Sequence, residues 1–137
     1  GCFGGGIVQG SLVLVGGDPG IGKSTLLLQV CRNLAEHKVK VLYISGEESQ
    51  AQVRMRASRI GAVEPNLLLA ATTDLSTALG LIEQCKPALA IVDSAQTIVS
   101  QEVDGISGGS TQVREVASAL IDTAKTLDIS SIFWLVM

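Results

Sequence analysis

Short apolar runs alternate along the chain with segments in which apolar residues recur at helical spacing. The runs have the length of β-strands and are rich in valine, leucine and isoleucine. They occupy residues 12–15, 39–44, 67–69, 89–92 and 132–136. Because almost every position within a run is apolar, we expect both faces of each strand to be covered, as in a parallel sheet between helices.

Four segments have the apolar spacing of amphipathic helices, at residues 26–35, 53–60, 75–82 and 113–127. Ser49, with Gln52 three residues later, predicts a capping box at the start of the second helix, and Gly61 predicts its end. Asp74 predicts the cap of the third helix. The alternation predicts an α/β fold with a largely parallel sheet of about five strands and helices on both faces, formed as a single domain by residues 1–137.

A glycine-rich segment joins the first predicted strand to the first predicted helix. Its residues are Gly17, Asp18, Pro19, Gly20, Ile21, Gly22, Lys23, Ser24 and Thr25. The segment matches G-x-x-x-x-G-K-[ST], the P-loop, whose backbone N–H groups surround the phosphates of a nucleotide. Lys23 adds positive charge for the outer phosphates, and the Ser24 hydroxyl is a ligand for Mg²⁺. The segment therefore predicts binding of a nucleoside triphosphate.

Acidic residues end or follow two of the predicted strands. Asp93 ends the fourth strand, at the position of a Walker-B acid that holds Mg²⁺ together with Ser24. Its alternative role is that of a solvated strand-end carboxylate. Glu47 and Glu48 follow the second strand, and one of them is a candidate to orient and deprotonate an attacking water. The alternative is that both only interact with the N-terminus of the next helix.

Composition and charge restrict the classes of protein. The chain of 137 residues is 47% hydrophobic but only 3% aromatic, which predicts an aliphatic core. No apolar run approaches the ~20 residues of a membrane span, so we expect a soluble, cytoplasmic protein without a membrane partner. Residues 1–63 hold seven Lys or Arg against four Asp or Glu, and residues 64–137 hold three against nine. Neither half has a basic block that by itself indicates nucleic-acid binding.

Two further features keep alternatives open. Arg54, Arg56 and Arg59 lie in the second predicted helix, where they form a solvated face, or where Arg56 and Arg59 contribute to a subunit interface. Residues 97–109 contain three glycines and form a surface loop, or the segment through which a ring or filament ATPase contacts its polymer.

Six strings of the sequence resemble the bacterial RadA/Sms DNA-repair ATPases, along essentially the whole chain. They are Gly4-Gly5-Gly6-Ile7-Val8, Gly10-Ser11-Leu12-Val13-Leu14, the P-loop, Leu42-Tyr43-Ile44-Ser45-Gly46-Glu47-Glu48-Ser49, Asp93-Ser94-Ala95-Gln96-Thr97 and Gln112-Val113-Arg114-Glu115. The strings Gly-Glu-Glu-Ser and Asp-Ser-x-Gln-Thr are not general features of P-loop proteins. They make the resemblance more specific than the P-loop alone.

The resemblance implies a RecA-like P-loop NTPase that uses ATP and Mg²⁺ to drive branch migration on DNA, usually as a homo-oligomeric ring. It implies that Lys23 and Glu47 are catalytic, with Glu47 preferred over Glu48. It places Asp93 as the Walker-B acid and the segment after it at the DNA channel. It also implies that the last strand lies between the P-loop strand and the Walker-B strand.

The chain also departs from the family. The four-cysteine zinc module, the Lys-Asn-Arg-Phe-Gly motif and the Lon-protease-like domain of the family have no counterpart in these 137 residues. We therefore expect a fragment of the ATPase core. Two alternatives to a DNA-repair ATPase remain, a nucleotide-binding oligomerisation module without turnover and a small-molecule kinase.

Overall fold

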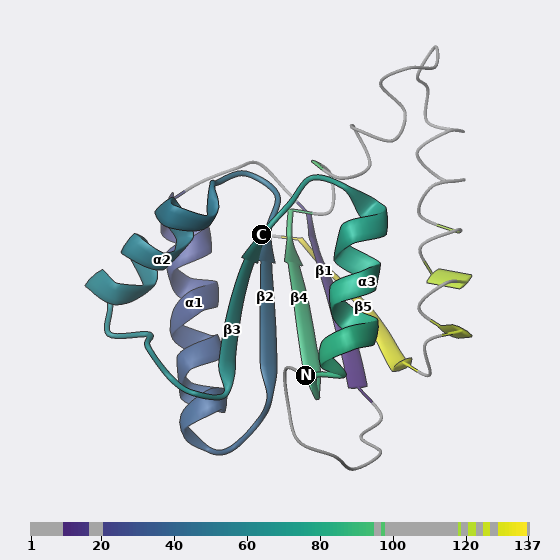
Figure 1. Ribbon diagram of the computed structural model, residues 1–137, viewed down its shortest axis with the longest axis horizontal. Helices are drawn as coiled ribbons and strands as arrows, with labels where there is room; N and C mark the ends of the chain where they lie inside the picture. The colour runs from purple at the N-terminus through teal and green to yellow at the C-terminus, as the bar shows by residue number, and fades with distance from the viewer. Residues whose placement is uncertain are drawn as a thin grey trace.

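The computed structural model describes residues 10–16, 21–94, 97, 118, 121–122, 125–126 and 129–136. The elements in chain order are β1 (Gly10–Gly16), α1 (Ile21–Glu36), β2 (Val41–Ser45), α2 (Gln50–Arg59), β3 (Leu67–Ala71), α3 (Leu75–Cys85), β4 (Leu89–Asp93) and β5 (Ile129–Val136) (Figure 1). Residues 17–20 of the P-loop, most of the glycine-containing segment after β4 and most of the helix predicted at 113–127 lie outside the described residues.

The strands form one sheet of five parallel strands in the order β3-β2-β4-β1-β5. The predicted α/β fold with a parallel sheet is therefore confirmed. The predicted place of the last strand is wrong, because β1 pairs directly with β4, from Ser11↔Leu89 to Val15↔Asp93. A strand has two edges, and β4 occupies one edge of β1, so β5 pairs with the other and lies at the side of the sheet.

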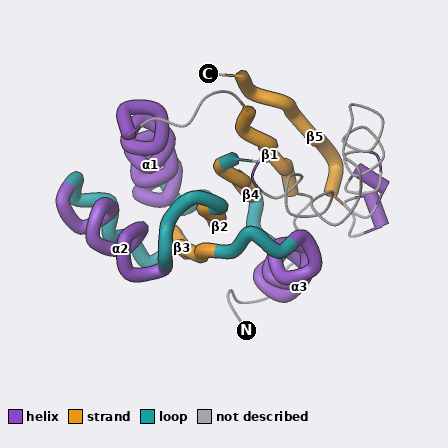
Figure 2. Tube along the Cα trace, turned by 90° about the horizontal axis from the view of Figure 1, so that it is seen from above, coloured by secondary structure: helices purple, strands orange, loops and turns teal. Residues whose placement is uncertain are grey.

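Helices cover both faces of the sheet. Figure 2 shows α1 and α2 on one face and α3 on the other. Along β2 the side chains alternate between these layers: Val41 and Tyr43 pack with α1 and α2, whereas Leu42 and Ile44 pack with α3. All five residues of β2 are buried, which explains why the strand reads as a continuous apolar run.

The predicted helix ends are confirmed where the structure describes them. The Ser49 hydroxyl accepts a hydrogen bond from the Gln52 N–H at 3.2 Å, and the Ser49 N–H donates to Gln52 Oε1 at 2.8 Å. The carboxylate of Asp74 accepts from the N–H of Thr77 at 2.9 Å. Gly61 follows α2 with a φ of 72°, a left-handed conformation that favours glycine. Among the described residues, no helix is both long and apolar enough to cross a lipid bilayer.

Candidate nucleotide and metal site

The carboxyl ends of β1, β2 and β4 meet at one edge of the sheet (Figure 1). In the parallel register, Asp93 of β4 pairs with Val15 of β1 on one side and with Ser45 of β2 on the other. The chain that leaves β1 enters the predicted P-loop, and the chain that leaves β2 carries Glu47. Asp93 therefore lies between the two segments to which the sequence assigns nucleotide chemistry.

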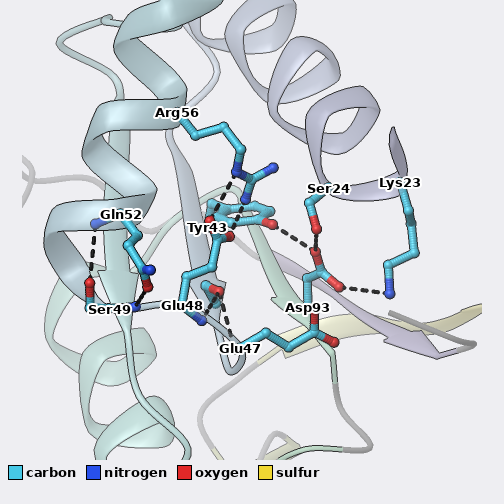
Figure 3. Close-up of polar contacts among 10 residues, drawn as sticks. Lys23, Ser24, Tyr43, Glu47, Glu48, Ser49, Gln52, Arg56 and Asp93 are labelled. Carbon is cyan, nitrogen blue, oxygen red and sulfur yellow. Dashed lines mark hydrogen bonds and ion pairs between the residues drawn. The ribbon is translucent and has the colours of Figure 1, made fainter. Parts of the chain in front are cut away.

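The Asp93 carboxylate is 1% exposed and makes three polar contacts (Figure 3). Its Oδ2 atom accepts hydrogen bonds from the Ser24 hydroxyl at 2.9 Å and from the Tyr43 hydroxyl at 2.7 Å. Its Oδ1 atom lies 3.1 Å from the Nζ atom of Lys23. A buried carboxylate is stable only with such partners, because burial removes its hydration. The alternative of a solvated strand-end Asp is excluded.

Lys23 and Asp93 have unused hydrogen-bonding capacity. Lys23 Nζ and Asp93 Oδ1 are buried, and neither atom has a hydrogen-bond partner among the described residues, although their charges form an ion pair. An ammonium group has three N–H donors, and a carboxylate oxygen has two lone pairs. The pair therefore has free donors for phosphate oxygens and free acceptor positions for water or a metal ion.

Five of the nine predicted nucleotide-binding residues lie at the start of α1. The helix begins at Ile21, five residues before the predicted apolar pattern, and it includes Gly22, Lys23, Ser24 and Thr25. The free N–H groups and the dipole of a helix N-terminus favour a bound anion. The apolar spacing alone did not mark this turn as helical, because four of its five residues are small or polar. Gly17, Asp18, Pro19 and Gly20 lie outside the described residues.

The side chain of Glu48 is held by Arg56 of α2. Arg56 Nε donates to Glu48 Oε2 at 3.1 Å, and Arg56 Nη2 donates to Glu48 Oε1. Burial opposes the charge of Arg56, but the hydrogen bonds with Glu48 raise its pKa above the usual value. Arg54 and Arg59 are exposed, as a solvated face predicts, whereas Arg56 turns toward the sheet.

The side chain of Glu47 has no such constraint. It is exposed, and none of the described residues forms a hydrogen bond or ion pair with its carboxylate. Its backbone N–H donates to Ser45 Oγ at 3.3 Å, and the N–H of Glu48 donates to the same atom at 3.2 Å. Ser45 thus fixes the turn that follows β2, and Glu47 extends from this turn near Asp93 (Figure 3).

Tyr43 belongs to the site, although sequence reasoning did not select it. It is fully buried on the α1 and α2 face of β2. Burial, followed by the neighbouring Asp93 carboxylate, raises its pKa far above the usual value, so the phenol keeps its proton. The available signal was a hydroxyl in an apolar strand, because a buried tyrosine usually has a hydrogen-bond partner. The identity of that partner depends on a register between residues 50 positions apart.

The residues present fit a Mg²⁺ ion bound together with a nucleotide. No group of three or more His, Cys, Asp or Glu side chains that could hold a metal occurs among the described residues. Mg²⁺ is usually bound by one or two protein oxygens, with phosphates and water completing its coordination. Ser24 and Asp93 provide such oxygens, which already lie 2.9 Å apart.

The chain is similar in sequence to a known family and to several named proteins. The AAA domain family matches residues 2–132. A protein of Mycolicibacterium smegmatis named DNA repair protein RadA is 52% identical over 123 residues, which are 90% of this chain and 26% of that protein. Proteins of the same name are 52% identical over 133 residues in Mycobacterium tuberculosis (95% and 28%) and 50% identical over 128 residues in Streptococcus pneumoniae (93% and 30%).

The chain thus spans about three tenths of the length of these relatives or less. The family match contains Glu47, Asp93 and all the described helices and strands except the end of β5. The predicted resemblance to RadA proteins is confirmed, and the chain belongs to the AAA domain family.

Proposed function

We propose that the chain is the ATP-binding and ATP-hydrolysing core of a DNA-repair motor. The observation that carries this proposal is the position of Asp93. Its carboxylate contacts Lys23 and Ser24 of the P-loop, and its backbone pairs in register with Ser45 at the end of β2. Asp93 thus lies between the P-loop, which follows β1, and the turn with Glu47, which follows β2. Metal-assisted phosphate hydrolysis needs residues of both kinds, for the phosphates and for the attacking water.

The P-loop residues bind and orient the triphosphate. Lys23 Nζ donates to the outer phosphates, and the N-terminus of α1 stabilises their negative charge. Ser24 and Asp93 hold Mg²⁺, which, when bound, neutralises charge that develops on the phosphate oxygens. Phosphate oxygens compete with Asp93 for the same ammonium group.

Glu47 is the better of the two candidates for the carboxylate that accepts the proton of the attacking water. It is exposed near the site, and no described side chain occupies its carboxylate. Glu48 is engaged through both of its carboxylate oxygens by the guanidinium of Arg56. A carboxylate whose two oxygens already accept hydrogen bonds is less accessible to an attacking water.

The DNA partner of the proposed motor is inferred from the relatives. They are named DNA repair proteins, and the matched region is about half identical in sequence. We extend this to a cytoplasmic ATPase that works on single-stranded or branched DNA, drives branch migration, and assembles as a homo-oligomeric ring. The DNA partner is tested by stimulation of ATP hydrolysis with single-stranded DNA. The ring is tested separately, by an ATP-dependent rise in molecular mass during sedimentation.

The central test is Glu47→Gln in the protein that contains this chain. We expect ATP hydrolysis to fall by about 10²–10⁴-fold while ATP binding is retained, since only the proton acceptor is lost. Glu48→Gln separates the two candidates, and we expect a smaller effect because glutamine still accepts a hydrogen bond from Arg56. Glu83→Gln, an exposed change on α3, is the matched control.

Two outcomes contradict the proposal. If Glu48→Gln abolishes hydrolysis and Glu47→Gln does not, the roles of the two carboxylates are exchanged. If the unmodified protein binds ATP but releases no phosphate with or without DNA, the chain is a nucleotide-binding module without turnover.

A further inference from the structure

The hydroxyl of Tyr43 supports Asp93 from within the core. Tyr43 pairs with Ile91 across β2 and β4, and Asp93 lies two residues farther along β4, on the same face. This diagonal position lets a long side chain cross to the neighbouring strand, and the Tyr43 hydroxyl donates to Asp93 Oδ2 at 2.7 Å. Both side chains are at most 1% exposed, so water does not replace this bond.

Tyr43 differs from the other two partners of Asp93. Lys23 and Ser24 are also the residues that bind phosphates and Mg²⁺ in the proposed function, so a bound nucleotide competes for their contacts with Asp93. Tyr43 lies on the sheet side of the carboxylate and has no such second role. The Tyr43 hydroxyl is thus a donor to Oδ2 that belongs to neither of the residues assigned to the ligand.

We propose that Tyr43 is the positioning residue of the Asp93 carboxylate in the metal-bound state. The inference rests on the proposed function, since it assigns Asp93 to Mg²⁺. It adds to that function a residue that touches neither nucleotide nor metal. It also explains why a tyrosine stands between aliphatic residues in β2.

The test is Tyr43→Phe in the protein that contains this chain, measured by binding of a fluorescent, non-hydrolysable ATP analogue with Mg²⁺ or with EDTA. Phenylalanine retains the ring and removes only the donor. Hydrogen bonds to charged groups contribute enough for about a tenfold loss of affinity in Mg²⁺, whereas affinity in EDTA stays the same. The Mg²⁺ concentration that gives half-maximal binding rises by a similar factor.

The matched control is Ile91→Val, which removes one methylene next to Tyr43 and leaves every polar contact in place. We expect it to lower thermal stability slightly and to leave the ratio of the two affinities unchanged. An equal loss in Mg²⁺ and EDTA for Tyr43→Phe, or the same Mg²⁺-specific loss for Ile91→Val, would assign Tyr43 a purely structural role. If the unmodified protein binds no nucleotide, the proposed function itself fails.

Discussion

The ends of β4 and β2 both carry acidic residues, but they hold them in opposite ways. Asp93 is buried and contacts Lys23, Ser24 and Tyr43, whereas Glu47 is exposed and its carboxylate has no partner among the described residues. A carboxylate that holds a metal ion must already be in place when the ion arrives. A carboxylate that accepts a proton from water must be reachable by that water.

The difference comes from the position of each acid relative to the strand. Asp93 is the last residue of β4, so the sheet register between β1 and β2 fixes its backbone. Glu47 is two residues past the end of β2, on a turn held by Ser45. Glu48, one residue later, is drawn to α2 by Arg56. Asp93, Glu47 and Glu48 thus have three different environments at the same edge of the sheet.

The largest expected effect on stability concerns Asp93, the buried acid of this comparison. Asp93→Ala leaves the Lys23 ammonium, which is 7% exposed, without its counter-charge, and we expect a loss of about 3–5 kcal/mol in the free energy of unfolding. Glu47→Ala should change that free energy by less than about 0.5 kcal/mol, since its side chain is exposed. Urea denaturation without nucleotide measures both.

A double variant serves as the control for this prediction. Lys23→Met combined with Asp93→Ala removes both charges, so most of the stability lost in Asp93→Ala should return. Equal destabilisation by Asp93→Ala and Glu47→Ala would show that burial does not distinguish the two acids.

A smaller effect on stability is expected where the turn after β2 contacts the end of β4. The Gly46 N–H donates to the backbone oxygen of Asp93 at 2.8 Å. A Cβ atom at Gly46 would lie 3.2 Å from Thr97 Cβ and 3.4 Å from the Ser94 oxygen. Gly46→Val should therefore lower the free energy of unfolding by about 1–3 kcal/mol, because it overpacks the contact between the two turns. Gly46→Ala should act in the same direction with a smaller effect.

Gly80 in α3 offers the matched control, since no packing neighbour among the described residues lies within 4 Å of a Cβ atom there. In an exposed helix position, Gly80→Ala should raise the free energy of unfolding by about 0.5–1 kcal/mol. Thermal or urea denaturation compares the two substitutions. A stabilising effect at both glycines would mean that the strand ends do not pack closely at Gly46.

The sequence predicted the helices and strands better than it predicted which strands pair with each other. Runs of apolar residues and caps such as Ser49 and Asp74 act within a few residues, so the helices and strands followed from local chemistry. An apolar run predicts that β5 is covered, but it carries no information on which strand edge is free. The place of β5 beside β1 therefore required the structure.

The candidate site shows the same limit. The P-loop, Asp93 and the two glutamates were predictable because each has a recognisable type at a strand or helix end. Tyr43 and Arg56 were missed because their roles depend on contacts with distant residues, Asp93 for the tyrosine and Glu48 for the arginine. The spacing of Arg56 and Arg59 predicted a surface, and tertiary packing turned only Arg56 toward the sheet.

Asp74, which follows β3, is a third kind of acid near a strand end and has the smallest expected effect. Its carboxylate accepts hydrogen bonds from the Thr77 hydroxyl at 2.6 Å and the Thr77 N–H at 2.9 Å, and these lower its pKa. A lowered pKa in the folded state means that the ionised group stabilises the fold above the ordinary value of 3.8, and that this contribution disappears as the pH falls through the folded pKa.

The variant Asp74→Asn tests the direction of this pH dependence. Asparagine is also a good N-cap but does not titrate, so the advantage of the unmodified chain should be present near pH 6 and should decrease toward pH 3. Urea denaturation at several pH values measures the difference between the two chains. A difference that stays constant with pH would show that Asp74 acts through its cap geometry alone. Asp74 would then differ from Asp93, where charge is the property that the buried site requires.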